Sequence, residues 1–479
     1  MITLQVGHDT IIEATVTPVS QTVTWTSEDP GVAHVVAGVV TALSEGASTI
    51  TAQVGEAKAE CLVIVEDKNK STDTVTTDGN LTDAIRYLAR SNKRGVGFSS
   101  PFYAEDVPIL QHAISWVYNW GTSPSAALDA AFTQYGMDFV PMAWNGVNEA
   151  SIRAYKQAHP QCKYILAFNE PNLTDQANMT PQQAAEKWPQ LKNLAQELGL
   201  MIVSPAMNYG TLSGYSDPVK WLDEFFACDG VSIDDVCAIA LHCYMGSAGA
   251  MKGFIDRFDK YNKPIWMTEF CGWEAPVNSA EDQLNYMSET VLMLERDTRV
   301  QRYAWFLARG NGSIDKKPWN QLITKTEPYT LSRPGLIYEG LTSFDTESWL
   351  DPEKHILMNT CSAVCTFADN TPTASPHFLP MGDLYNTLTM TAFTAGKWVE
   401  FQVEAGKDLQ TLFLHAMAYS KTGLKVMIDG QEATSIELAR SKDESYSTTN
   451  HAVSLSKGKH VLRIESVTGN SCIHWIQFK

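Results

Sequence analysis

The stretch MDFVPMAWNGVNEASIRAYKQAHPQCKYILAFNEPN (137–172) contains two short apolar runs separated by a helix-like segment. The first run covers 137–145 and the second covers 163–172, with the helical pattern at 147–159 between them. A strand, a helix and a second strand in so few residues predict a parallel βαβ unit. The second run ends close to a carboxylate, Glu170.

The same alternation continues on both sides of this unit, from about residue 81 to 344. Apolar runs and helical patterns of 10–20 residues follow one another until eight runs have passed, which predicts a (β/α)8 TIM barrel. An open, doubly wound sheet is the alternative, but it would usually carry a phosphate-binding glycine cluster after the first strand, and GFSSPFY (97–103) does not. The eight runs are RGVGFSS (94–100), ISWVYNWG (114–121), MDFVPMAWN (137–145), KYILAFNEPN (163–172), LMIVSPAMNY (200–209), VCAIALHCYMG (236–246), KPIWMTEF (263–270) and VQRYAWFLARG (300–310).

The regions outside the barrel have the alternating pattern of short β-strands. Residues 1–67 show such runs at intervals of 8–12 residues, and 345–479 show them again, so each region predicts a β-sandwich. The polar stretch DKNKSTDTVTTDGN (67–80) is typical of a linker. The predicted fold is therefore multidomain: a β-sandwich at 1–67, a catalytic barrel at 68–344 and a second β-sandwich module at 345–479.

Composition excludes several classes of protein. The 479 residues include 36 Lys and Arg against 54 Asp and Glu, a net charge of −18, and no basic cluster interrupts this acidity. Nucleic acid and anionic membranes are therefore poor partners, whereas a neutral sugar is indifferent to the charge. No apolar run reaches the roughly 18 residues that a membrane-spanning helix needs. The nine cysteines lack the spacing of a disulfide framework or a zinc site, which favours buried thiols.

Two carboxylates stand at the ends of the fourth and seventh predicted strands, Glu170 in AFNEPN and Glu269 in IWMTEF. The strands of a barrel end at the face that carries the active site, so these two side chains can meet one substrate. Hydrolysis of a glycosidic bond needs such a pair: one carboxyl group protonates the leaving oxygen and the other attacks the sugar carbon, about 5–5.5 Å away in a retaining enzyme. We therefore predict a glycosidase site, with neither a cofactor nor a metal ion.

Other candidate residues lie near the same strand ends. His242 and Tyr244 are two residues apart on the sixth run, so they point to the same side of the strand. His242 and Cys243 point to opposite faces, which argues against a shared metal ion. Aromatic side chains at strand ends can pack on the apolar face of a sugar ring. The predicted substrate-binding aromatic residues are Trp120, Trp144, Tyr209, Trp273 and Trp305, with Trp305 as the floor of the cleaving subsite.

The motifs RGVGFSS, WVYNWG, VPMAWN, LAFNEPN, SPAMN, LHCYMG and WMTEFCGW resemble glycoside hydrolase family 128, the glycosyl hydrolase catalytic core, across about residues 85–344. The resemblance implies a retaining endo-β-1,3-glucanase in which Glu170 is the acid/base and Glu269 the nucleophile. It also implies that Asn169 binds the 2-hydroxyl of the cleaved sugar and that Tyr244 orients the nucleophile.

The flanking regions resemble two known modules. VTWTSEDPGVAHVVAGVVTALSEGASTITAQVG (23–55) is similar to the bacterial Ig-like group 2 domain. WVEFQVEAG (398–406), LKVMIDGQ (424–431) and LSKGKHVLRIESVTGNSCIHWIQF (455–478) resemble a family 6 carbohydrate-binding module, although the opening TESWLDPEKHILMNTC (346–361) departs from that family.

Two other functions stay open: a related retaining enzyme that acts on another β-glycan, and a non-cleaving glycan-binding protein. The sequence MITLQVGHDT (1–10) shows no signal peptide. Because such modules accompany exported polysaccharide-degrading enzymes, we expect a secreted, cell-surface or periplasmic monomer whose leader has been removed, with a polysaccharide as its partner.

Overall fold

The structure is a computed structural model of the chain. It describes residues 1–5, 8–16, 23–43, 46–66, 81, 84, 87–310, 318–324, 329–369, 372–381 and 387–479. The predicted linker at 67–80 lies outside these residues. The chain divides into two compact units, one of which holds 87–348 and 362–375 and contains the site; the other holds 1–86, 349–361 and 376–479.

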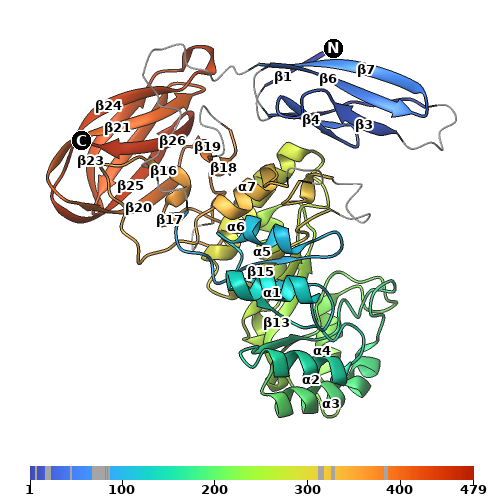
Figure 1. The fold of residues 1–479 in the computed structure, drawn as a ribbon. Helices are drawn as coiled ribbons and strands as arrows, with labels where there is room; N and C mark the ends of the chain where they lie inside the picture. Colours follow the sequence, from blue (N-terminus) through green and yellow to red (C-terminus); the bar gives the residue numbers. More distant parts are fainter. Residues whose placement is uncertain are drawn as a thin grey trace. The chain divides into compact units, whose positions relative to one another are not determined.

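The site-bearing unit is built on a curled sheet of eight parallel strands (Figure 1). All eight predicted runs contribute one strand each, in the order β10-β9-β8-β15-β14-β13-β12-β11. A parallel bridge between Met142 and Leu166 links the two edges of the sheet. The strands are β8 (Arg94–Gly97), β9 (Trp116–Tyr118), β10 (Asp138–Phe139), β11 (Tyr164–Leu166), β12 (Met201–Val203), β13 (Val236–Cys243), β14 (Ile265–Phe270) and β15 (Val300–Trp305).

Helices connect these strands and cover the outer face of the sheet. Thr180 caps α3 with a hydrogen bond from the Gln183 amide, and Pro181 occupies the first turn. Trp188 on α3 packs edge-on against Phe168, which follows β11. The helices are η1 (Ala104–Leu110), α1 (Ala126–Tyr135), α2 (Glu149–Ala158), α3 (Pro181–Leu198), α4 (Pro218–Phe226), η2 (Ile233–Asp235), α5 (Ala248–Asp256), η3 (Asp259–Tyr261), α6 (Ala280–Arg296), η5 (Pro318–Asn320) and α7 (Arg333–Gly340).

Alternation along each strand divides the side chains between two cores. On β15, Ala304 belongs to an interior cluster with Trp116 and Trp266, while Trp305 packs against Tyr338 of α7. The interior is thus filled by side chains. Polar groups at the carboxyl ends of the strands are therefore held by a rigid core below them.

At the amino-terminal end of β8, the buried Arg94 ties the first strand of the sheet to the last helices. Its guanidinium donates to Glu295 of α6 at 3.1 Å and to the carbonyl oxygens of Leu341 at 3.1 Å and Thr342 at 3.0 Å. Close by, the Ser343 hydroxyl donates to the Ala89 carbonyl at 2.6 Å. The two ends of the 87–348 stretch of this unit are therefore neighbours.

A buried carboxyl group in α7 should make the stability of the protein depend on pH. Oε2 of Glu339 accepts hydrogen bonds from the amides of His112 and Ala113, and burial raises its pKa from 4.5 to about 8. Between these values the unfolded chain loses the proton that the folded chain keeps. The stability that Glu339 contributes is therefore full below pH 4.5 and is lost as the pH rises toward 8, by up to about 5 kcal/mol.

We predict that Glu339→Gln flattens this dependence, because the amide cannot ionise. Thermal unfolding measured from pH 4 to 9 should show a smaller fall in Tm for the variant than for the parent chain. Glu186→Gln, which changes an exposed carboxylate on α3, should leave the slope unchanged. Equal slopes for Glu339→Gln and the parent would contradict the prediction.

The N-terminal region forms two small sheets, one ordered β1-β7-β6-β3 and the other β2-β5-β4. Trp25 is partly buried against a cluster that includes Val40, Ile50 and Val63. The strands are β1 (Ile2–Gln5), β2 (Asp9–Ile11), β3 (Thr24–Ser27), β4 (Ala33–Val36), β5 (Val39–Ala42), β6 (Gly46–Val54) and β7 (Ala57–Glu66).

The C-terminal region is also rich in antiparallel sheet. One sheet runs β18-β19-β26-β21-β24, with β16 beside β26, and a second runs β20-β25-β22-β23. Short elements here are β16 (Ile356–Leu357), η6 (Met358–Thr360), β17 (Ala363–Val364), β18 (His377–Leu379) and η7 (Lys442–Glu444). The longer strands are β19 (Thr389–Thr394), β20 (Trp398–Ala405), β21 (Leu409–Ala418), β22 (Thr422–Ile428), β23 (Gln431–Leu438), β24 (Ser447–Leu455), β25 (Gly458–Thr468) and β26 (Asn470–Phe478).

Two predictions concern the whole chain. The nine cysteines carry thiols, and five of them are buried, as the scattered spacing indicated. None of the helices in the described residues combines the length and the apolar character that crossing a bilayer requires.

Candidate active site

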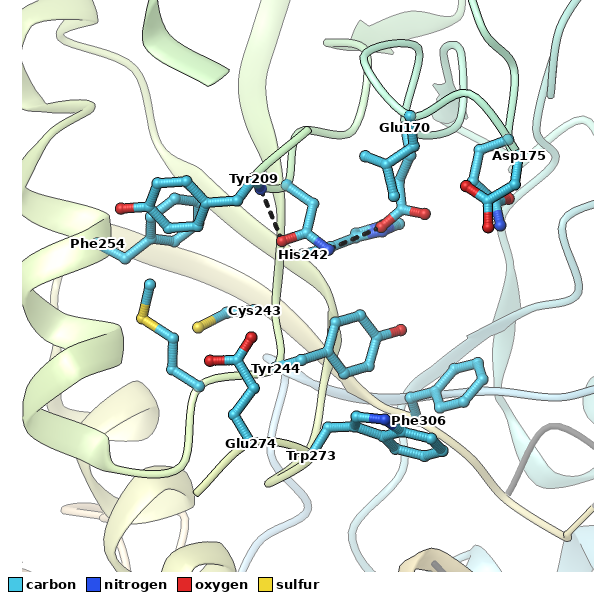
Figure 2. A pocket seen from close by; sticks show the side chains of 14 residues that line it. Glu170, Asp175, Tyr209, His242, Cys243, Tyr244, Phe254, Trp273, Glu274 and Phe306 are labelled. Carbon is cyan, nitrogen blue, oxygen red and sulfur yellow. Dashed lines mark hydrogen bonds and ion pairs between the residues drawn. The ribbon is translucent and has the colours of Figure 1, made fainter. Parts of the chain in front are cut away.

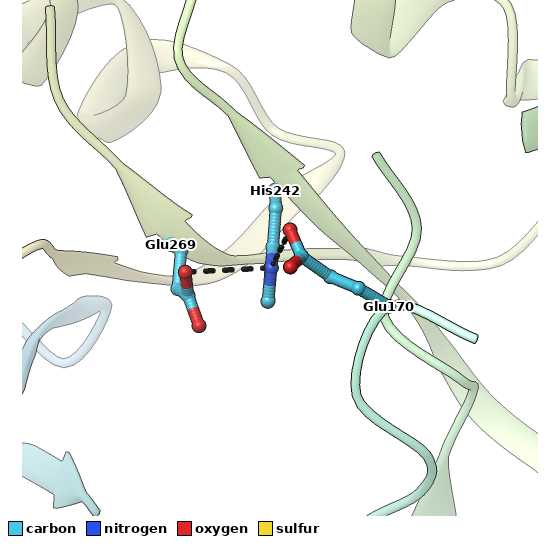
Figure 3. A group of neighbouring side chains, drawn as sticks. All are labelled: Glu170, His242 and Glu269. Atoms are coloured by element: carbon cyan, nitrogen blue, oxygen red, sulfur yellow. Dashed lines mark hydrogen bonds and ion pairs between the residues drawn. The ribbon is translucent and has the colours of Figure 1, made fainter. Parts of the chain in front are cut away.

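Glu170, His242 and Glu269 meet at the carboxyl ends of their strands (Figure 3). His242 on β13 and Glu269 on β14 are paired residues of neighbouring strands. Glu170 follows β11 with φ at +43°, a conformation that non-glycine residues rarely adopt. Strain of this kind concentrates at functional sites, and here it belongs to the residue whose carboxylate reaches His242.

His242 is fully buried between the two carboxylates. Its Nδ1 lies 2.9 Å from Oε1 of Glu170 and 3.5 Å from Oε2 of Glu269. Burial alone would lower the pKa of His242, but the two carboxylates outweigh it and raise that pKa. Burial alone would likewise raise the pKa of Glu170, yet the charge and hydrogen bond of His242 leave it below its usual value. His242 and Glu170 therefore share a proton along one hydrogen bond.

Three uncharged groups donate hydrogen bonds to Glu269. Oε1 accepts from the Tyr118 hydroxyl at 3.0 Å and from Nε1 of Trp120 at 2.6 Å, and Oε2 accepts from the Tyr244 hydroxyl. Burial, reinforced by the nearby carboxylate of Glu170, raises the pKa of Glu269 against the opposing effects of His242, Tyr244 and Trp120. The ionised form of Glu269 thus depends on these donors.

Two amide side chains accompany Glu170. Asn208, after β12, donates from Nδ2 to Oε1 of Glu170 at 3.1 Å. The buried Asn169 donates from Nδ2 to Gln176 at 3.3 Å, while its Oδ1 is buried without a hydrogen-bond partner. An acceptor without a partner can still take a hydrogen bond from a hydroxyl group.

Glu170, His242 and Glu269 are also a donor set that a divalent cation could use, because one ligand atom of each lies within 4.8 Å of the others. Several of these ligand atoms are already hydrogen-bonded, however. Nδ1 of His242 is hydrogen-bonded to Glu170, and the oxygens of Glu269 accept from Tyr118, Trp120 and Tyr244. The geometry therefore fits a hydrogen-bonded cluster that holds and moves protons.

A cavity of about 460 Å³ opens beside Glu170 (Figure 2). Five residues predicted from the sequence line it: Glu170, Tyr209, His242, Tyr244 and Trp273. The structure adds nine more lining residues: Leu173, Asp175, Gln176, Asn208, Cys243, Met245, Phe254, Glu274 and Phe306.

Trp305 is not brought to this cavity, contrary to the prediction that it forms the floor of a subsite. Its side chain has no exposed surface, and Nε1 donates to the Asn320 carbonyl at 2.6 Å on the helix-facing side of β15. The reason is the strand alternation, which turns Trp305 outward. The next residue, Phe306, lines the cavity and meets Tyr244 edge-on.

Two other predicted aromatic residues lie outside the lining of this cavity. Trp144 is half-buried against the interior cluster of the sheet, outside the cavity lining. Trp120 directs its N–H to Glu269.

Sequence reasoning missed Tyr118, Asn208 and Gln176. Tyr118 could have been found, because it stands two residues before Trp120 in the same predicted run, and alternate residues of a strand face the same way. Asn208 ends the fifth run, the same signal that singled out Glu170. Gln176 lies in a loop, where no periodicity predicts direction.

Comparison with known proteins assigns the chain to a family. Residues 95–338, just over half of the chain, match the profile of the glycosyl hydrolase catalytic core. The chain belongs to this family. It is a glycoside hydrolase, and residues 2–63 match the bacterial Ig-like domain (group 2).

Solved structures similar to this glycoside hydrolase include two enzymes described as GH128 (subgroup II) endo-β-1,3-glucanases. The one from Pseudomonas viridiflava is 39% identical, with 53% of this chain and 99% of that chain covered and a TM-score of 0.47. The one from Sorangium cellulosum is 31% identical, with 52% and 97% covered and a TM-score of 0.45.

A curated relative of the glycoside hydrolase is alkali-sensitive linkage protein 1 of Schizosaccharomyces pombe, which is 27% identical over 234 residues. The match covers 45% of this chain and 39% of the relative, so the chain spans well under half the length of that protein.

Proposed function

We propose that this glycoside hydrolase is an endo-β-1,3-glucanase that cleaves with retention of configuration. The observation that carries the proposal is the pair Glu170 and Glu269, whose facing oxygens lie within 4.8 Å around His242. This separation fits a retaining enzyme, whereas an inverting enzyme leaves about 6.5–9.5 Å for a water molecule. The proposed substrate is supported by sequence similarity to the glucanases of Pseudomonas viridiflava and Sorangium cellulosum, at 39% and 31% identity.

In the first step, Glu269 attacks the anomeric carbon while Glu170 protonates the departing oxygen. The proton comes from the 2.9 Å hydrogen bond between His242 and Glu170, since its transfer to the carboxylate leaves a neutral imidazole. In the second step, water attacks the glycosyl ester, gives its proton to Glu170 and releases Glu269 as a carboxylate. Oδ1 of Asn169, which has no hydrogen-bond partner, is suited to accept a hydrogen bond from the 2-hydroxyl of the sugar.

The cavity beside Glu170 serves the leaving-group side of the bond. It is lined by the acid Glu170 and by Trp273 and Tyr209, but Glu269 is not among its lining residues. An acid contacts the oxygen between the two sugars, whereas a nucleophile contacts only the sugar on the other side. Aromatic rings at this position can pack on the apolar face of the departing chain.

The test is incubation with laminarin, curdlan, lichenan, mannan and xylan, followed by separation of the products. We expect short β-1,3-linked oligosaccharides from laminarin and curdlan, with the β-anomer of the new reducing end appearing first in ¹H NMR spectra. Cleavage of mannan or xylan alone would establish the alternative, a related enzyme for another β-glycan. Binding without new reducing ends would establish a glycan-binding protein, and the α-anomer appearing first would exclude retention.

We further propose the organisation around this activity. The 68–344 region is a complete (β/α)8 barrel, and the Met142–Leu166 bridge supports its closure. It is flanked by β-sandwich modules at 1–67 and 345–479, the latter a carbohydrate-binding module of the family 6 type. The protein acts as an exported monomer on polysaccharide, consistent with its Ig-like domain.

A further inference from the structure

The indole of Trp120 is fixed against the carboxylate of Glu269. Its N–H lies 2.6 Å from Oε1, and its backbone has φ at +60°, which is rare for a large side chain. The ring is half-buried between Tyr118 and Phe306, at centroid distances of 5.1 and 5.9 Å. On a third side, a Cβ atom on Gly97 would lie only 3.3 Å from the ring. Packing and backbone conformation together therefore fix the direction of the indole N–H toward Oε1 of Glu269.

The second donor to the same oxygen, the Tyr118 hydroxyl, divides its hydrogen bond between two acceptors. The hydroxyl of Tyr118 has one proton but two acceptors, the Thr268 carbonyl at 2.9 Å and Oε1 of Glu269 at 3.0 Å. The indole of Trp120 also has a single N–H proton, and it donates that proton to Glu269. Trp120 is therefore the stronger of the two constraints on Oε1.

The groups that face the other oxygen of Glu269 are already engaged. The Tyr244 hydroxyl donates to Oε2, and Nδ1 of His242, 3.5 Å away, is hydrogen-bonded to Glu170. The negative charge on Oε1 therefore depends on Trp120 and Tyr118, which are both neutral donors.

We propose that Trp120 is a positioning residue that controls how readily Glu269 leaves the sugar in the second step. The inference rests on the proposed function, in which Glu269 is the nucleophile. In the first step, an oxygen of Glu269 bonds to the anomeric carbon, the bond to the leaving oxygen breaks, and Glu170 supplies the proton. In the second step, water bonds to that carbon, Glu170 takes its proton, and the electron pair of the ester bond returns to Glu269.

The charge on Glu269 thus exists before and after the covalent intermediate but not in it. A donor to the carboxylate stabilises the charged states more than the ester. Trp120 therefore makes Glu269 a weaker nucleophile and a better leaving group. Its loss should slow the second step and spare the first at pH values where Glu269 stays ionised.

The variant Trp120→Phe removes the donor and keeps an aromatic ring. We expect the second step to slow about tenfold. With dinitrophenyl β-laminaribioside, a burst of dinitrophenol should precede the steady state, and intact-protein mass spectrometry should find the glycosyl-enzyme accumulating. Tyr118→Phe should also produce a burst and an accumulated glycosyl-enzyme, but both should be smaller. Because Tyr118 donates to the same Oε1 of Glu269, this variant provides the test if Trp120→Phe does not fold.

Two matched controls remove the same kind of bond elsewhere in the unit. Trp188→Phe breaks an indole bond to Asp235 of 3.0 Å, and Tyr215→Phe breaks a hydroxyl bond to Glu224 of 2.7 Å. Neither should produce a burst. Equal bursts in the controls and in Trp120→Phe would overturn the proposal, and so would slowing of the first step alone.

A titration without substrate separates this proposal from the proposed function. The ¹³C carboxyl signal of Glu269, assigned by its loss in Glu269→Gln, should titrate about one pH unit higher in Trp120→Phe. An unchanged midpoint would refute the role of Trp120 even if the enzyme cleaves β-1,3-glucan. A raised midpoint in an enzyme that leaves laminarin intact would support the donor role and refute the proposed substrate.

Discussion

Replacing Glu269 with alanine should lower kcat on laminarin by about 10⁴- to 10⁶-fold, as is typical when an enzyme loses its nucleophile. The remaining parts of the site, including the acid Glu170, cannot form the glycosyl ester. The fall should appear in steady-state release of reducing ends, with the fold of the variant checked by its thermal transition. Activity within tenfold of the parent would show that Glu269 is not the nucleophile.

Azide gives this prediction a stereochemical readout. In Glu269→Ala, azide fits the space of the missing carboxylate and attacks a dinitrophenyl β-glycoside directly. One displacement inverts the anomeric carbon, so the product should be the α-glycosyl azide, which ¹H NMR identifies from its coupling constant. A β-glycosyl azide from this variant would assign Glu269 to the acid/base role instead.

Replacing Glu170 with alanine should lower kcat on laminarin by about 10³-fold, within the usual range for general acid–base catalysis. With dinitrophenyl β-laminaribioside, the rate of the first step should fall much less, because the leaving group of this substrate needs no proton. Azide should then attack the glycosyl-enzyme, and the two displacements should give the β-glycosyl azide. Equal losses on both substrates would contradict the acid role.

The same variant should change the pH profile of kcat/KM on laminarin, whose leaving group needs the proton. In the parent enzyme, activity should rise with pH as Glu269 ionises, at a pKa raised by burial, and fall as the proton shared by Glu170 and His242 is lost. The carboxylates raise the pKa of His242, so this fall should lie above the ordinary range of histidine. In Glu170→Ala, kcat/KM should still rise with pH as Glu269 ionises, but it should no longer fall at higher pH. A profile that keeps both limbs would place the shared proton elsewhere.

The strands were predictable because eight apolar runs repeat with helical segments between them, and each run is a strand of one parallel sheet. Glu170 and Glu269 were predictable for a related reason: strand ends of a barrel converge, so position along the run is enough to bring them together. Trp305 shows the limit of this reasoning. One residue further along β15 changes the direction of the side chain, and the run itself does not reveal where the alternation begins.

Contacts that depend on loop conformation could not be predicted. Trp120 follows β9 in a left-handed conformation, and that turn sends its N–H to Glu269. Gln176 reaches Asn169 from a loop in the same way. Such contacts depend on backbone angles outside the regular elements, for which hydrophobic periodicity carries no information.

The position of Arg94 has a consequence for how such a chain can evolve. Arg94 and the Ser343–Ala89 hydrogen bond hold the two ends of the 87–348 stretch together at the amino-terminal ends of the strands. Glu170, His242 and Glu269 belong to the opposite ends. Neighbouring modules can therefore be gained, lost or exchanged by recombination at one pole, while the loops at the other pole diversify under selection for substrate.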